Sequence, residues 1–143
     1  MSTGFCFEDL SVGQSASATH VVSDADIRAF ADVSGDHNPV HLDQSFAETT
    51  PFKGRIAHGM LAGAYISALI ASKLPGPGAI YISQHLSFRR PVRIDDSLEI
   101  VATITHLDDA KARVTLATVA SVAGKTVVEG EAVIMAPRRP AAV

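Results

Sequence analysis

Residues 59–72 read Gly-Met-Leu-Ala-Gly-Ala-Tyr-Ile-Ser-Ala-Leu-Ile-Ala-Ser, without one charged side chain. The run Pro75-Gly76-Pro77-Gly78 follows closely, which predicts a helix that begins at His58 or Gly59 and stops before Pro75. This helix is apolar almost all round, so other parts of the chain must wrap it. It is shorter than the roughly 20 residues that a membrane-spanning helix needs, so we expect a buried helix and no membrane partner.

Five segments predict the strands that wrap this helix. Residues 98–107 show the clearest alternation, with Leu98, Ile100, Ala102 and Ile104 on one face. Short turns at 108–110 and 123–125 favour hairpins. We predict an antiparallel meander of four strands over residues 79–89, 98–107, 113–122 and 126–135, with a fifth strand at 14–22. The chain is therefore expected to be α+β, with a five-stranded antiparallel sheet around one long helix.

Two short helices are expected between the first strand and the long helix. Ser23 is a typical N-cap for a helix over residues 24–33, and Gly35 is a typical terminator. A second short helix is predicted over residues 42–49, before Pro51. Together they form a helical overhang beside the sheet.

The bulk composition limits the possible functions. A chain of 143 residues with 47% hydrophobic and 19% charged residues fits one domain, 1–143, with 136–143 expected to be a flexible tail. The net charge of −3 argues against nucleic acid as a partner. The single cysteine, Cys6, excludes an internal disulfide and gives no zinc-ligand spacing. The N-terminus lacks the pattern of a signal peptide, so a cytoplasmic location is expected.

The stretch Asp36-His37-Asn38-Pro39-Val40-His41 carries the first chemical signal. Pro39 fixes its own φ and disfavours helical geometry at Asn38, so the acid and the imidazole cannot share one regular helix. A turn with Asp36 and His41 at its two ends can direct both side chains into one cleft. We interpret them as an acid/base pair.

The stretch Ala57-His58-Gly59-Met60 carries the second signal. The first N–H groups of a helix have no partner within the helix and favour a negative charge. Gly59 is therefore an oxyanion candidate, where the missing side chain lets a substrate approach the backbone. An acid/base pair and an oxyanion site together suit the addition or removal of water next to a carbonyl.

These motifs, with Ile80-Tyr81, Leu86-Ser87-Phe88, Pro91-Val92 and Gly130-Glu131-Ala132-Val133, resemble the MaoC-like hydratases of the hotdog fold. Among them, the chain is most similar to the short R-specific enoyl-CoA hydratases. The resemblance implies hydration of trans-2-enoyl-CoA to (R)-3-hydroxyacyl-CoA, without metal or other cofactor, by a homodimer with paired sheets. It also implies a link to fatty-acid oxidation and polyhydroxyalkanoate synthesis.

The resemblance assigns roles to individual residues. Asp36 and His41 match the catalytic pair, although which of the two accepts the proton of water stays open. Gly59 matches the oxyanion donor, and Ser67, two turns along the helix, matches a residue that positions water or substrate. Asn38 and His58 are further positioning candidates.

Each of these residues also has a simpler structural explanation. The role of Asp36 and Asn38 could be limited to stabilising the turn. His58 could simply be the residue at which the helix begins, and the Ser67 hydroxyl could donate to a carbonyl one turn earlier in the helix. The pair Arg89-Arg90 could bind CoA phosphate or form a solvated strand edge. Ile70 and Ile134 are predicted to limit the acyl pocket to short and medium chains.

Three other functions remain open. A 3-hydroxyacyl-thioester dehydratase acting on CoA or acyl carrier protein runs the same step backwards with the same residues. A hotdog thioesterase usually carries a carboxylate near the central helix, and residues 59–72 have none. A non-catalytic acyl-CoA-binding module would not need both Asp36 and His41.

Overall fold

The structure is a computed structural model that describes residues 4–141. A 3-10 helix, η1, spans Phe7–Asp9. The helices are α1 (Asp24–Ser34), α2 (Pro39–Leu42), α3 (Gln44–Ala47) and α4 (Gly59–Ser72), and the strands are β1 (Ser15–Val21), β2 (Ile80–Phe88), β3 (Ser97–Asp108), β4 (Arg113–Val122) and β5 (Lys125–Met135). The predicted central helix and five strands are confirmed.

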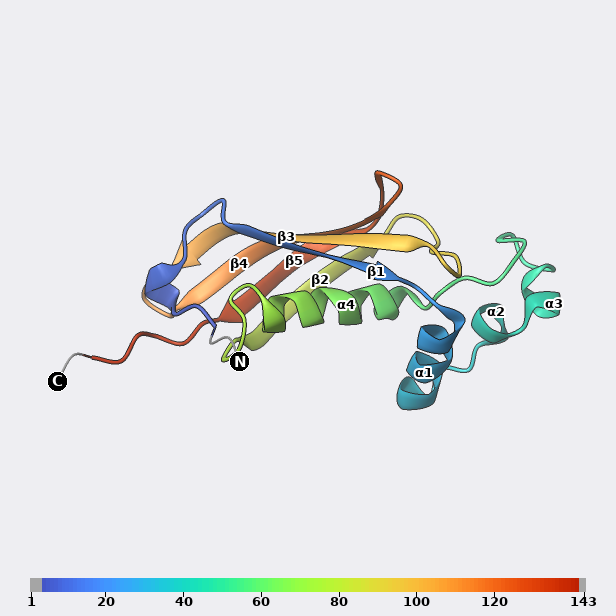
Figure 1. The fold of residues 1–143 in the computed structure, drawn as a ribbon, viewed down its shortest axis with the longest axis horizontal. Coiled ribbons are helices and arrows are strands. Elements are labelled where there is room, and N and C mark those ends of the chain that lie inside the picture. The colour runs from blue at the N-terminus through green and yellow to red at the C-terminus, as the bar shows by residue number, and fades with distance from the viewer. Residues whose placement is uncertain (1–3, 142–143) are drawn as a thin grey trace.

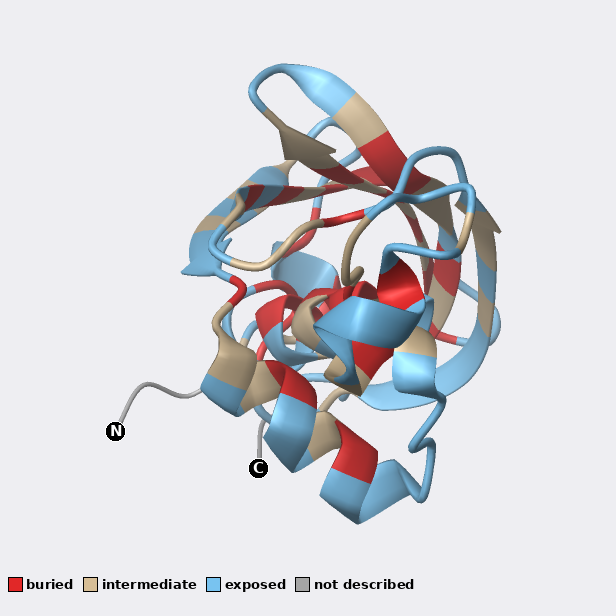
Figure 2. Ribbon diagram, turned by 90° about the vertical axis from the view of Figure 1, so that its right-hand side faces the viewer, coloured by how far each residue is buried: buried red, intermediate tan, exposed pale blue. Residues whose placement is uncertain are grey.

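The five strands form one antiparallel sheet that curves around α4 (Figure 1). Viewed from the end of the molecule that carries α1, α2 and α3, the sheet curves over the central helix (Figure 2). Leu61, Ala62, Ile66, Leu69 and Ile70 of α4 are all buried. The sheet removes this side of α4 from water. On the opposite side, Met60, Ala64, Ala68 and Ala71 are exposed, so the expectation that the chain wraps the whole helix is wrong. This arrangement is the hotdog fold.

The strand order, β1-β3-β4-β5-β2, corrects the predicted four-strand meander. Only β3, β4 and β5 follow one another in space, joined by tight turns such as Ala123-Gly124, where both residues have positive φ. β2 pairs with β5 instead of β3. The connection over residues 89–96 is too long to impose a hairpin, and both sides of β3 are already occupied by β1 and β4.

The alternation predicted for residues 98–104 is confirmed. Leu98, Ile100, Ala102 and Ile104 are at most 1% exposed and face α4 within the core. Val114, Leu116 and Ala120 of β4 continue this buried face beside them. The core therefore lies between α4 and the concave face of the sheet.

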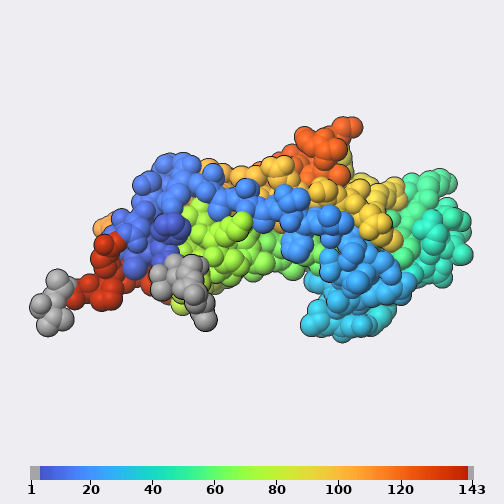
Figure 3. All heavy atoms as spheres, viewed as in Figure 1, coloured from blue at the N-terminus to red at the C-terminus, as the bar shows by residue number. Residues whose placement is uncertain are grey.

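The helices α1 to α3 project past the sheet, next to the first turn of α4 (Figures 1 and 3). The Ser23 side chain accepts a hydrogen bond from the Asp26 N–H, and Gly35 ends α1 with φ 80°, as predicted. The predicted helix over 42–49 is instead two short helices. α2 begins earlier, at Pro39, because proline is well suited to the first position of a helix.

The segment after β5 is bonded to the N-terminal segment. Ala136 is 3% exposed, the Phe7 N–H donates to the Pro137 carbonyl, and the Arg139 N–H donates to the Glu8 carboxylate. Residues 142–143 of the predicted flexible tail lie outside the described residues. Within residues 4–141, no helix has the length and apolar character to cross a membrane.

Candidate active site

The turn between α1 and α2 is built by two successive side-chain caps. The Asp36 carboxylate accepts from the Asn38 N–H over 3.1 Å, and the Asn38 side chain accepts from the Val40 N–H over 3.2 Å. Pro39 then starts α2 at its first position. Asn38 therefore stabilises the turn locally, and the turn brings Asp36 and His41 to the same place.

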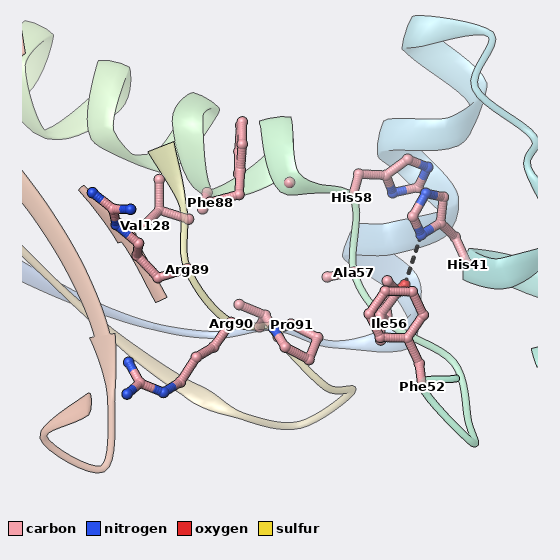
Figure 4. A pocket seen from close by; sticks show the side chains of 13 residues that line it. His41, Phe52, Ile56, Ala57, His58, Phe88, Arg89, Arg90, Pro91 and Val128 are labelled. Atoms are coloured by element: carbon pink, nitrogen blue, oxygen red, sulfur yellow. Dashed lines mark hydrogen bonds between the residues drawn. The ribbon is translucent and has the colours of Figure 1, made fainter. Parts of the chain in front are cut away.

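His41 is buried, with 8% of its surface exposed. Its Nδ1 lies 2.8 Å from the Ile56 carbonyl oxygen, to which it donates, so Nε2 carries a free lone pair (Figure 4). Burial lowers the pKa of His41 below 6.5; the Ile56 hydrogen bond opposes this, the nearby His58 lowers it further, and Asp36 raises it. His41 is therefore held as a neutral imidazole that can accept a proton.

His58 occupies the N-cap position of α4, makes no capping hydrogen bond with its side chain, and is 3% exposed. Its Nε2–H donates to the main-chain carbonyl of Asp36 over 3.0 Å. Its ring lies against the ring of His41, tilted by 30° with centroids 4.0 Å apart, and meets Phe30 edge-on at 4.9 Å. Among the described residues, His58 Nδ1 has no hydrogen-bond partner. A buried lone pair of this kind favours a donor from water or substrate.

Asp36, His41 and His58 each place one N or O atom within 4.8 Å of the others. Such a set offers the nitrogen and oxygen ligands that a metal ion accepts, and the same atoms can hold a water molecule by hydrogen bonds. The arrangement suits a water molecule held between a carboxylate and an imidazole.

Gly59 is the first residue of α4, and no acceptor within residues 4–141 uses its N–H. A Cβ at this position would lie 2.7 Å from Phe88 Cε1, so a side chain would collide with the Phe88 ring. Glycine therefore leaves this N–H open beside the histidine pair.

Three hollows meet around Gly59 and Met60. The first, about 350 Å³, is lined by His41, His58 and Gly59, and also by Arg89 and Arg90 (Figure 4). The second, about 400 Å³, contains Asp36 with His58, Gly59 and Met60. The third, about 370 Å³, is mostly apolar and runs along α4 past Met60 to Ser67, Tyr81 and Leu86. His58 and Gly59 border both the hollow that contains His41 and the hollow that contains Asp36.

The remaining predicted residues lie farther away. Ser67 borders the third hollow, about 12 Å along the helix from Gly59 at 1.5 Å per residue, and not the hollows of Asp36 and His41. Ile70 and Ile134 are buried in the core and border none of these three hollows. Their predicted roles remain predictions.

Arg89 and Arg90 have partners within the protein. Arg89 pairs with Glu129 at 2.9 Å, and Arg90 donates to the Thr126 carbonyl. Both also border the first hollow.

Phe30, Phe88 and Arg55 were not predicted to be site residues. Phe30 and Phe88 shape the hollows, and Arg55 donates to the carbonyl of His41 over 2.7 Å. The contact between Arg55 and His41 joins residues 14 positions apart, so no local pattern indicates it. The sequence offered only the position of Arg55, shortly before His58-Gly59.

The fold and the site define a hotdog protein with an aspartate–histidine site at the N-terminus of its central helix. The chain belongs to the MaoC-like dehydratase family, since the MaoC like domain matches residues 10–129.

Two curated relatives and one solved structure illustrate the similarity. The (R)-specific enoyl-CoA hydratase of Rhodospirillum rubrum is 51% identical, over 93% of this chain and 92% of that protein. The 3-hydroxybutyryl-CoA dehydratase of Methylorubrum extorquens is 44% identical, over 93% and 85%. The unliganded R-hydratase PhaJ1 from Pseudomonas aeruginosa superposes with a TM-score of 0.90 at 47% identity, over 98% of this chain and 97% of that chain.

Proposed function

We propose that this chain is an (R)-specific enoyl-CoA hydratase that adds water to trans-2-enoyl-CoA. One observation carries the proposal: Gly59, whose N–H is open, borders both the hollow with neutral His41 and the hollow with Asp36. An oxyanion donor beside a carboxylate and an imidazole is what conjugate addition of water to a thioester requires.

The proposed reaction uses each group once. Water loses a proton to the Asp36–His41 pair while its oxygen bonds to C3 of the enoyl group. The C2–C3 π electrons move towards the thioester, whose oxygen becomes negative and accepts from the Gly59 N–H. The Asp36–His41 pair then gives the proton to C2. The product therefore carries the hydroxyl at C3 and the proton at C2, and the pair regains its initial protonation state. Because the pair is coupled, the base is assigned to the pair as a unit.

The proposal includes the substrate range and the assembly. The substrate is an acyl-CoA of short to medium chain length, with Ile70 and Ile134 as the limiting residues. The assembly is a homodimer joined through β2, the strand at one edge of the sheet. Ile80, Tyr81, Ile82 and Phe88 of this strand are exposed in the single chain, which favours a partner on that edge.

The test is hydration of crotonyl-CoA, followed as loss of enoyl-thioester absorbance with chiral analysis of the product. We expect (R)-3-hydroxybutyryl-CoA from the wild type and losses of about 10² to 10⁴ in kcat for Asp36→Asn and His41→Ala. The matched controls are Asp32→Asn and His37→Ala, an exposed acid–imidazole pair 3.5 Å apart next to the site. These should leave kcat unchanged.

A second candidate is the dehydration direction on a 3-hydroxyacyl thioester. It is favoured by the similarity to the Methylorubrum extorquens protein named a 3-hydroxybutyryl-CoA dehydratase. Competition between CoA and acyl-carrier substrates, measured in both directions, separates the two. Release of free CoA would support the thioesterase alternative, and binding without turnover would support an acyl-CoA-binding module.

A further inference from the structure

Arg55 lies in the segment that leads into α4, and its side chain is only 11% exposed. Its Nη2 contacts Asp24 Oδ1 at 2.5 Å, at the first position of α1. Its Nε donates to the main-chain carbonyl of His41 over 2.7 Å. One guanidinium therefore joins α1, α2 and the entry to α4.

We propose that Arg55 is a positioning residue for His41, an inference that rests on the proposed function of the Asp36–His41 pair. α2 has only four residues, so its own hydrogen bonds cannot hold His41 rigidly. The Arg55–Ile56 dipeptide supplies the missing restraints. Arg55 binds the carbonyl of His41, the Ile56 carbonyl binds its ring, and the Ile56 N–H donates to the Val40 carbonyl over 3.3 Å.

A contribution to folding stability does not by itself explain why the Arg55 side chain is nearly buried between α1 and α2. Removing most of a guanidinium from water is costly, and the partner carboxylate of Asp24 is 46% exposed, so solvent screening leaves this ion pair little net contribution to stability. Asp24 already has an exposed partner in Arg28, 2.9 Å away. What Arg55 adds is a planar fork whose separate N–H groups reach the carboxylate and the His41 carbonyl together. A lysine keeps the charge but has no such fork.

The experiment compares Arg55→Met, Arg55→Lys and, as the control on the same carboxylate, Arg28→Met. We expect kcat for crotonyl-CoA hydration to fall about 10- to 100-fold in both Arg55 variants with KM within about 3-fold, since a displaced acid/base group slows the chemical step. Arg28→Met should keep the wild-type kcat. Millimolar guanidinium should restore part of the activity of Arg55→Ala.

A second readout follows the His41 ring directly, by NMR titration with His41→Gln to assign the signal. The charged and titratable groups around this ring are Asp36, His58 and Arg55. If Arg55 positions His41, the ring becomes more exposed and its pKa rises in both Arg55 variants. A purely Coulombic effect would raise it in Arg55→Met but leave Arg55→Lys at the wild-type value.

The outcomes separate the two proposals. Full kcat in folded Arg55→Met, or an equal loss in Arg28→Met, would overturn the positioning role. If the wild type fails to hydrate crotonyl-CoA, the proposed function is wrong, and the titration alone decides whether Arg55 holds His41. If Arg55→Met does not fold, Arg55→Lys and the rescued Arg55→Ala decide it.

Discussion

The imidazole of His58 holds the main chain of Asp36, through a hydrogen bond of 3.0 Å from Nε2 to the Asp36 carbonyl. The Asp36 side chain is itself exposed, so the bond through its backbone is what ties it to α4. His58 therefore holds the backbone carbonyl of Asp36, just as Arg55 holds the backbone carbonyl of His41.

The first prediction concerns this bond. A glutamine amide can reach the place of His58 Nε2, whereas an asparagine amide reaches only the place of Nδ1. We expect His58→Gln to keep kcat within about 10-fold and His58→Asn to lose about 100-fold, because Asp36 shifts in the latter. Steady-state kinetics on crotonyl-CoA check this. Equal activities of the two variants would mean that the bond does not position Asp36.

The second prediction is a pH dependence. The folded protein holds the pKa of His41 below its ordinary 6.5, so the unfolded chain binds the proton more tightly. The stability from neutral His41 is complete above pH 6.5 and is lost as the pH falls through the lower folded pKa. We expect urea midpoints to drop on acidification more in the wild type than in His41→Gln. The acid limb of kcat/KM should likewise lie below pH 6.5. Parallel curves for the two proteins would contradict this expectation.

The third prediction concerns Gly59. In Gly59→Ala the new Cβ would lie 2.7 Å from the Phe88 ring, and this ring can move aside because it is the far end of a side chain and not backbone. We expect a folded protein whose kcat/KM is about 100-fold lower, because the methyl group and the displaced ring block access to the N–H. The control is Gly54→Ala, whose Cβ would have no contact closer than 3.5 Å. A fully active Gly59→Ala would remove Gly59 from the site.

The fourth prediction tests the assembly. A lysine in place of Ile82, on the free edge of the sheet, should turn the dimer into a monomer in analytical ultracentrifugation, because strand edges with lysine resist pairing. Val12→Lys, at an exposed position outside β2, should leave the dimer intact. A wild type that sediments as a monomer would refute the proposed homodimer.

The fifth prediction concerns chain length. Ile70 lies one helical turn beyond Ser67, so shortening it should open space next to the third hollow. We expect Ile70→Val, which costs about 0.5 to 1.5 kcal/mol of stability, to shift kcat/KM towards longer enoyl-CoA substrates. An unchanged chain-length profile would show that Ile70 does not limit the acyl pocket.

Much of the fold was predictable because its signals are local. The charge-free run over 59–72 predicted α4, and the alternation from Leu98 to Ile104 predicted the buried face of β3. The place of β2 was not predictable, because the pairing of β2 with β5 depends on how the sheet closes around α4. Asp36 and His41 were predicted to be an acid/base pair, because Asn-Pro makes the chain change direction between them.

The sequence by itself determined the elements of this protein and the residue types for its chemistry, since periodicity, caps and turn residues act between near neighbours. Only the tertiary structure decided how those residues are held. Arg55, Ile56 and His58 contact the Asp36–His41 turn across 14 to 22 positions of sequence. Such contacts exist only after the overhang packs against the entry to α4, so no local pattern encodes them.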